Sequence, residues 1–265
     1  MSQQKASKTT DIIIFIGPAL LGIFILNIIP MCMSFNLSFS HWNLLGSITL
    51  VGFKNYQHVL SDPLFWTTLS NTAIFAAGSV CLEVLCALTL AFGLSKITKG
   101  IKLFETLYFL PVITPMVAVA LVWGWMLDPS NGVINQITHW FGLPKIAWLY
   151  EPGWAMVWVI ILRAWKELGY STLLLWTALK ALPQDLFEAS HLDGANAWQQ
   201  FTRVTLPQLS PILCFVTTVS TIGAFQAFDS IYLLTQGGPQ NSTQVLVYWI
   251  FKNAFSFYKI GEASA

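Results

Sequence analysis

Long stretches without Asp, Glu, Lys or Arg dominate the pattern of this chain. The longest uncharged stretch is 12–53, and residues 106–127 and 204–228 are also uncharged. An α-helix needs about 20 apolar residues to cross the ~30 Å hydrocarbon core of a bilayer. The pattern therefore predicts an all-α, polytopic transmembrane helical bundle. Five spans are expected, near residues 12–39, 70–94, 104–127, 154–178 and 209–234.

Composition supports a membrane protein over a soluble one. Of 265 residues, 55% are apolar and 9% are charged, whereas roughly 25% are charged in an ordinary soluble domain. This balance excludes a soluble globular enzyme. The net charge of +1 provides no basic field for a nucleic acid, so the expected surroundings are a lipid bilayer and no nucleic acid. No repeat or change in composition divides the chain, so residues 1–265 are expected to form a single transmembrane domain.

The segments between the spans differ in their content of Lys and Arg. Segments 1–11, 95–103 and 179–208 carry seven (Lys5, Lys8, Lys96, Lys99, Lys102, Lys180 and Arg203). The longer segments 40–69, 128–153 and 235–260 carry four (Lys54, Lys145, Lys252 and Lys259). Because short cytoplasmic loops retain positive charge, the first group is expected inside. The N-terminus is therefore predicted to be cytoplasmic.

Four charged side chains lie far from the ends of the predicted spans. Glu83 lies in the second span, and Arg163, Lys166 and Glu167 lie in the fourth. A charge at bilayer depth costs roughly 2.5–3.5 kcal/mol on insertion scales, so these groups should face a bundle interior, a partner subunit or a water-filled route. Arg163 and Glu167 are spaced to pair along one helix. An intrahelical ion pair and a role in a pathway both remain open.

Proline and tryptophan leave two further alternatives open. Prolines in or beside the spans (Pro18, Pro30, Pro111 and Pro115) indicate either kinks satisfied by neighbouring helices or discontinuous helices that line a route. The twelve tryptophans are typical either of an interfacial aromatic belt or of stacking platforms for sugar rings.

Residues 179–208, between the fourth and fifth spans, are too polar to cross a membrane. The pattern predicts two short helices: Pro183 begins the first, Gly194 permits a turn, and Pro207 ends the second. Such an amphipathic hairpin suits a groove in a soluble partner. The alternative is a helix that lies in the headgroup layer.

This loop resembles a motif of the permease subunits of type I ABC importers. Their cytoplasmic loop has the pattern EAA, three residues, G, nine residues, I, one residue, LP. The chain has Glu188-Ala189-Ser190, Gly194 and Val204-Thr205-Leu206-Pro207 at every matching spacing. It departs from the pattern with Ser190 for the second Ala and Val204 for Ile. The resemblance implies the type I ABC importer permease fold and docking to an ATPase through Glu188, Ala189, Gly194, Leu206 and Pro207.

Three other stretches, at 51–72, 103–135 and 228–255, are similar to the carbohydrate-uptake branch, which includes maltose, lactose and glycerol-3-phosphate importers. The last stretch resembles the first of two paired permeases. The resemblance implies a second permease subunit, two copies of a cytoplasmic ATPase subunit, an external solute-binding protein and a carbohydrate substrate. It also implies a multi-pass location in the bacterial cell inner membrane. Sugar contacts are expected on the inner faces of the later spans, where Trp165, Lys166, Phe225 and Asp229 are candidates.

Sequence motifs for catalysis are absent. The chain has no GxxxxGK[ST] phosphate loop, no HExxH and no GxSxG. Neither a cofactor, a metal site nor a catalytic residue is expected, and ATP hydrolysis is assigned to a partner subunit. The expected function is a translocation subunit of an ATP-driven importer of a sugar or sugar derivative. The alternatives are a permease for an amino acid or peptide and, less favoured, a membrane-embedded enzyme.

The end of the sequence gives one more expectation. Residues 244–258 are too short to span a bilayer and are expected to form an outer interfacial helix, with Trp249 and Phe257 candidates for contact with membrane or partner. In the resembled family a sixth span begins at a stretch like 261–265. The native product is therefore expected to continue with roughly 20 or more apolar residues.

Overall fold

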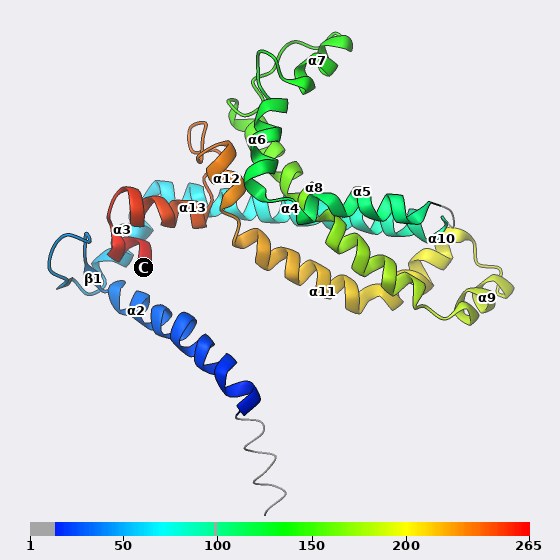
Figure 1. Ribbon diagram of the computed structural model, residues 1–265, viewed down its shortest axis with the longest axis horizontal. Helices are drawn as coiled ribbons and strands as arrows, with labels where there is room; N and C mark the ends of the chain where they lie inside the picture. The colour runs from blue at the N-terminus through cyan, green and yellow to red at the C-terminus, as the bar shows by residue number, and fades with distance from the viewer. Residues whose placement is uncertain (1–13, 98–99) are drawn as a thin grey trace, which may run out of the picture. The chain divides into compact units, whose positions relative to one another are not determined.

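A computed structural model describes residues 14–97 and 100–265 of the chain (Figure 1). Lys5, Lys8 and Lys99, which contribute to the predicted sidedness, lie outside these residues. Contacts divide the described chain into two compact units, 14–66 with 249–265, and 67–248. This division is not apparent from composition. The helices α4 (Pro63–Ser95) and α13 (Leu246–Phe251) each contribute residues to both units.

The smaller unit combines the N-terminal helix, a short strand pair and the last turns of the sequence. The Asn55 side-chain amide donates to the carbonyls of Ser38 at 2.8 Å and Ser40 at 2.9 Å. A Cβ at Gly261 would collide with the Ser40 carbonyl, so glycine permits this close approach. The elements are the helix Ile14–Leu37, including η1 (Phe24–Ile28) and α2 (Ile29–Leu37), then β1 (Ser40–His41), β2 (Thr49–Leu50), α3 (Lys54–Ser61), η3 (Lys252–Ser256) and α14 (Ile260–Ser264). The strands pair antiparallel.

The larger unit contains the remaining helices and a core shared by α4 and two later helices. Its further elements are α5 (Ile101–Ile113), α6 (Met116–Met126), α7 (Val133–Trp140), α8 (Pro152–Lys180), α9 (Gln184–Leu192), α10 (Ala197–Gln200), η2 (Phe201–Thr205), α11 (Leu206–Phe225) and α12 (Asp229–Leu234). Apolar side chains of α4, α8 and α11 form a buried cluster: Ala87, Ala91, Leu94, Leu175, Trp176 and Val216. The packing of these three helices forms the hydrophobic core of the larger unit.

Within the described residues, the helices that are long and apolar enough to cross a membrane are fewer than the five predicted spans. Three are long and apolar enough to cross a membrane: Ile14–Leu37, Pro63–Ser95 and Ala197–Phe225. Leu103–Ile113 and Met116–Met126 pass the same test together, but a bend of 100° separates them. The α8 helix has 29 residues, about 43 Å at 1.5 Å each, although its charged residues make it less apolar. The helix over the third predicted span is therefore discontinuous, and its lining of a transport route stays a prediction.

Proline and a tight helix contact explain the break between α5 and α6. Pro115 has no backbone N–H and lies at the bend with an extended ψ of 137°, which ends α5 two residues earlier. On α8, a Cβ at Gly169 would collide with the Tyr108 carbonyl oxygen and lie 2.9 Å from Val112 Cγ2. The absence of a side chain at Gly169 lets α5 and α8 run in contact (Figure 1).

Two expected boundaries are wrong. Pro207 does not end the second hairpin helix, because the helix continues from Ala197 to Phe225. The π-helical turn η2 precedes α11 and Pro207 lies in the first turn of α11, where its missing N–H is tolerated. The fifth predicted span is not continuous to residue 234, because α11 ends at Phe225 and Asp229 begins α12. A carboxylate in a first helical turn favours such a new start.

Five tryptophans form a packed series in the larger unit. Neighbouring ring centroids lie 5.0–5.9 Å apart in the order Trp154, Trp148, Trp158, Trp123 and Trp165. Trp148 is buried, whereas Trp154 and Trp165 at the two ends of the series are 42% and 37% exposed, so mainly the middle of the series is used in packing. Other tryptophans remain exposed, namely Trp66, Trp125, Trp140 and Trp198.

The predicted interfacial helix at 244–258 corresponds to α13 and η3. Trp249, a candidate for contact with membrane or partner, is buried and its ring lies 5.7 Å from that of Phe65. Phe257 is exposed. The sequence pattern did not show that Trp249 packs inside the protein while Phe257 stays accessible to a membrane or a partner.

We expect Gly169→Ala to destabilise the protein, because the new methyl group meets the backbone of α5. Overpacking of this kind costs about 1–3 kcal/mol. Gly153→Ala is the matched control on α8, since a Cβ there has no neighbour within 4 Å. Thermal unfolding of the purified protein in detergent should show a midpoint several degrees lower for Gly169→Ala alone. Equal midpoints for the two variants would contradict the close contact.

Candidate functional site

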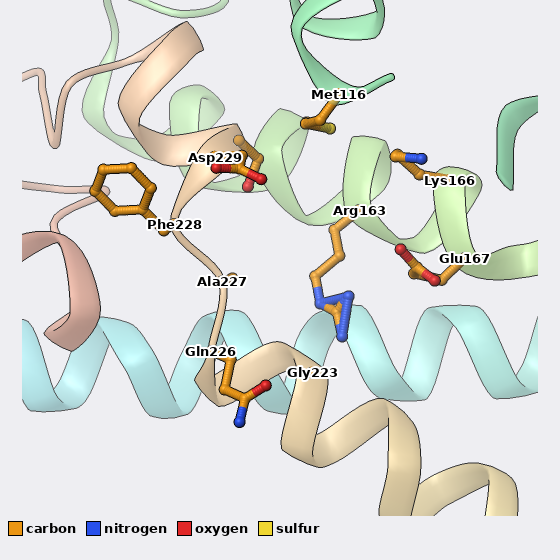
Figure 2. Close-up of a pocket in the computed structure, with 10 residues that line it drawn as sticks. Met116, Arg163, Lys166, Glu167, Gly223, Gln226, Ala227, Phe228 and Asp229 are labelled. Atoms are coloured by element: carbon orange, nitrogen blue, oxygen red, sulfur yellow. The ribbon is translucent and has the colours of Figure 1, made fainter. Parts of the chain in front are cut away.

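A cavity of about 390 Å³ lies among α6, α8, α11 and α12 (Figure 2). This volume lies within the roughly 300–1,000 Å³ typical of small-molecule pockets. Both backbone breaks border it, because Met116 begins α6 and residues 226–228 separate α11 from α12. The lining residues are Met116, Arg163, Lys166, Glu167, Gly223, Gln226, Ala227, Phe228, Asp229 and Ser230.

The ammonium group of Lys166 stabilises the broken span. Its Nζ atom donates to the carbonyl oxygens of Pro111 at 3.1 Å, Val112 at 3.3 Å and Thr114 at 3.0 Å. An ammonium has three N–H groups, so these acceptors match its full donor capacity. A cation at the C-terminal end of a helix also complements the partial negative charge of the helix dipole. Lys166 therefore satisfies the backbone groups that the break in α5 exposes.

Glu83 connects three helices through hydrogen bonds of its carboxylate. It is only 1% exposed, and its Oε1 accepts hydrogen bonds from Ser171 Oγ at 2.5 Å and Ser220 Oγ at 2.7 Å. The three side chains belong to α4, α8 and α11. Of the three surroundings that the sequence left open for Glu83, the structure shows the interior of the bundle. Its two hydroxyl donors offset part of the cost of placing a carboxylate there.

Arg163 does not pair with Glu167, although their spacing allows it. Within the described residues no ion pair joins them; instead Arg163 Nη2 donates to the Ser220 carbonyl at 2.8 Å. A Cβ at Gly223 would lie 3.1 Å from Nη2, so glycine leaves room for the guanidinium (Figure 2). The Arg163 side chain thus continues the polar contacts of Glu83 up to the cavity.

The structure separates the four candidates for solute contact. Lys166 and Asp229 line the cavity, whereas Trp165 and Phe225 are not among its lining residues. The Trp165 ring packs 5.5 Å from that of Trp123, and Phe225 is the exposed last residue of α11. Helical spacing could have added Arg163 and Glu167, because positions i, i+3 and i+4 share one helix face. The cavity residues from α6 and α11 carry no comparable signal in the sequence.

The predicted hairpin forms at one end of α8 and α11 (Figure 1). Pro183 precedes α9, as expected. Gly194 has φ +77°, a left-handed conformation that most side chains disfavour. Asn196 then begins α10 with a reciprocal capping box formed with Gln199. The Asn196–Gln199 spacing was a sequence signal for this start.

Ser190 and Gln200 close the hairpin in a way that the motif does not reveal. Gln200 Nε2 donates to Ser190 Oγ at 2.7 Å and to the Phe187 carbonyl at 3.1 Å. Ser190 is a departure from the family pattern, and its hydroxyl supplies an acceptor that alanine lacks. The Ser190 hydroxyl, which replaces an alanine of the family pattern, therefore links α9 to α10.

Most residues of the loop motif are accessible. Glu188, Ala189, Gly194 and Pro207 are exposed, and Leu206 is half-buried. Leu192 and Trp198, on the same hairpin, are 88% and 71% exposed. The hairpin thus presents both apolar and acidic side chains. Its exposed apolar groups are available to a partner or to a membrane surface.

The long apolar helices, the buried polar contacts and the exposed hairpin define a multi-pass helical membrane protein. The chain belongs to the family described as "Binding-protein-dependent transport system inner membrane component", which matches residues 83–260. The matched range begins at Glu83 and includes both the cavity and the hairpin. The chain is thus a membrane component of a transport system, as its motif predicts.

Similar proteins match over most of their length. The chain is 36% identical over 259 residues to the probable ABC transporter permease protein YurN of Bacillus subtilis (strain 168), covering 95% of this chain and 88% of the relative. It is 33% identical over 249 residues to the lactose transport system permease protein LacF of Rhizobium radiobacter, covering 92% and 83%. It is also 33% identical over 255 residues to the arabinooligosaccharides transport system permease protein AraP of Halalkalibacterium halodurans, covering 95% and 80%.

The fold is similar to that of a solved permease chain. A crystal structure of a bacterial alginate ABC transporter, in complex with an alginate pentasaccharide-bound periplasmic protein, matches with a TM-score of 0.84. The match has 22% sequence identity and covers 98% of this chain and 88% of that chain. The similarity confirms the predicted type I importer permease fold.

We expect Glu83→Ala to destabilise the protein by about 2–4 kcal/mol, because it leaves two buried hydroxyl groups without their acceptor. Glu83→Gln is the matched control, since its amide oxygen can still accept from Ser171 and Ser220. Thermal unfolding in detergent should show a clearly smaller loss for Gln than for Ala. Equal losses would assign the effect to the charge of Glu83 rather than to its hydrogen bonds.

Lys166→Met should loosen the break between α5 and α6. Methionine keeps an unbranched apolar stem but donates no hydrogen bond to the three carbonyls. Hydrogen–deuterium exchange over residues 109–118 should become at least several-fold faster. Lys180→Met is the control on the same helix, because the Lys180 ammonium lies 3.9 Å from the Trp176 ring centroid instead. An unchanged exchange rate in Lys166→Met would show that Lys166 does not stabilise the break between α5 and α6.

Proposed function

We propose that the chain is the translocation subunit of an ATP-driven importer for a sugar or sugar derivative. The observation that carries the proposal is the hairpin at 183–207, which has every spacing of the motif that couples such permeases to an ATPase. Family membership supports the transport role. The names of LacF and AraP, which refer to lactose and arabinooligosaccharides, favour carbohydrate over an amino acid or peptide.

The proposed assembly contains a second permease subunit, two copies of a cytoplasmic ATPase subunit and an external solute-binding protein. Glu188, Ala189, Gly194, Leu206 and Pro207 form the contact with the ATPase. The exposed positions on α9 and the turn at Gly194 support this assignment, because a docking surface must be accessible. ATP hydrolysis belongs to the partner, and this chain converts it into movement of its helices.

The N-terminus and the hairpin lie on the cytoplasmic side in this proposal. Two contacts in the larger unit support the sidedness. The Phe92 ring, near the end of α4, lies 4.9 Å from that of Phe201, so the C-terminal end of α4 lies beside the hairpin. At the start of α4, Asn71 Nδ2 donates to the Asn241 carbonyl at 2.8 Å. Segments on the same predicted side are therefore together at each end of α4.

The cavity is the proposed position of the solute during transport. Lys166 and Asp229 remain candidates for contact with the solute because they line the cavity. Trp165 and Phe225 have a weaker claim, since their side chains lie outside the lining. Lys166 acts through the backbone of α5 in this proposal, whereas Asp229 faces the solute.

Gly194→Val should uncouple transport from ATP hydrolysis, because a β-branched side chain is strained at φ +77°. Gly194→Asn is the matched control, since Asn tolerates the left-handed region. In proteoliposomes that contain the complete importer, Val should lower solute uptake at least tenfold and Asn should lower it much less. Intact ATPase stimulation and uptake in Gly194→Val would contradict the docking assignment.

A deletion experiment tests the solute class. Cells that lack this subunit should lose uptake of a carbohydrate and regain it when the intact subunit is supplied. Loss of amino-acid or peptide uptake, with carbohydrate uptake unchanged, would favour the alternative function.

A further inference from the structure

The two basic and two acidic side chains that line the cavity are not equally available to a solute. Lys166 directs its donors to the carbonyls of Pro111, Val112 and Thr114. Arg163 directs Nη2 to the Ser220 carbonyl, and its Nε atom is enclosed without a partner within the described chain. Both cations are therefore engaged, at least in part, by backbone groups.

The carboxylates are in the opposite situation. Glu167 and Asp229 line the cavity, and within residues 14–97 and 100–265 no hydrogen bond or ion pair uses either side chain. They come from α8 and α12, and Figure 2 shows them on different sides of the cavity. Each carboxylate oxygen accepts hydrogen bonds and donates none. The free polar atoms that these two residues present to a solute are thus acceptors.

Charge balance limits which solute suits this arrangement. The lining carries two basic and two acidic side chains, so it provides no net charge to compensate a charged solute. Removing an uncompensated charge from water is costly. An anionic sugar would also lie near two open carboxylates, while the Lys166 ammonium has no remaining N–H for it and only Arg163 keeps N–H groups beyond its bond to the Ser220 carbonyl. An uncharged solute with many O–H donors avoids both penalties.

We propose that Glu167 and Asp229 bind the hydroxyl groups of an uncharged saccharide and select it over anionic saccharides such as uronates. The inference rests on the proposed function of the same cavity and adds its substrate class. Hydrogen bonds from hydroxyl groups to carboxylates are charge-assisted and stronger than those between neutral groups. Lys166 is a positioning residue in this scheme, since it holds the wall from which Met116 projects.

The first experiment uses proteoliposomes that contain the complete importer and its solute-binding protein. One set receives neutral oligosaccharides released from starch, arabinan and xylan, and the other receives oligouronates released from pectate and alginate. Mass spectrometry identifies the saccharides that accumulate inside after ATP is supplied. Accumulation of neutral saccharides alone is the expected result.

The other outcomes are distinguishable. Accumulation of oligouronates would overturn the inference and leave the proposed function intact. Accumulation of neither mixture would overturn the proposed function and, with it, the inference.

The second experiment tests the residues with the neutral saccharide that accumulates. Glu167→Gln and Asp229→Asn should each lower its uptake rate about tenfold, because the amide oxygen can still accept but the hydrogen bond is no longer charge-assisted. The amount of assembled complex and its thermal unfolding midpoint should remain unchanged, which a structural defect would not allow. Glu151→Gln is the control, because Glu151 precedes α8 and is not among the cavity residues. Normal uptake in both carboxylate variants would overturn their assignment.

Discussion

The need to satisfy polar groups inside an apolar bundle determines much of this structure. Water is not available in the core of a bilayer to pair with a backbone carbonyl or a buried carboxylate. At the break after α5, Lys166 donates to three carbonyls. Deeper in the bundle, the Ser171 and Ser220 hydroxyls donate to Glu83. These contacts stabilise the interrupted helix beside the cavity and the buried carboxylate of Glu83 inside the bundle.

The same helices connect the cavity to the hairpin. From Lys166 to the end of α8 the chain advances 14 residues, about 21 Å at 1.5 Å each. From Leu206, α11 returns to Gly223 over 17 residues, about 26 Å. Their cores pack through Leu175, Trp176 and Val216. A displacement of the hairpin therefore reaches the cavity through two packed helices, which fits a subunit that is driven from the hairpin.

Much of this organisation could be predicted from the sequence. Uncharged stretches indicated the long apolar helices at Ile14–Leu37, Pro63–Ser95 and Ala197–Phe225 because lipid penalises charge. The spacing around Gly194 indicated the hairpin because the motif is local. The end of the hairpin was predicted incorrectly at Pro207, since a preceding π-helical turn accommodates this proline. The partner of Arg163 was also not predictable. Local spacing favours Glu167, but the actual acceptor is the Ser220 carbonyl on another helix.

The cavity itself depends on contacts between segments that are distant in the sequence. Asp229 was a candidate, but its position across the cavity from Glu167 requires the break between α5 and α6 and the break between α11 and α12, which composition does not reveal. Likewise, only the structure distinguishes an ammonium that is fully engaged from a carboxylate that is free. Residue type suggested Lys166 as a solute ligand, whereas its geometry favours a role in holding α5.

The central claim is that the transported solute occupies the cavity among α6, α8, α11 and α12. A cryo-electron microscopy map of the complete importer, trapped with its solute-binding protein and a transported saccharide, would test it most directly. The account predicts saccharide density within hydrogen-bonding distance of Glu167 and Asp229. Density bound elsewhere in the membrane region, with this cavity empty, would contradict it.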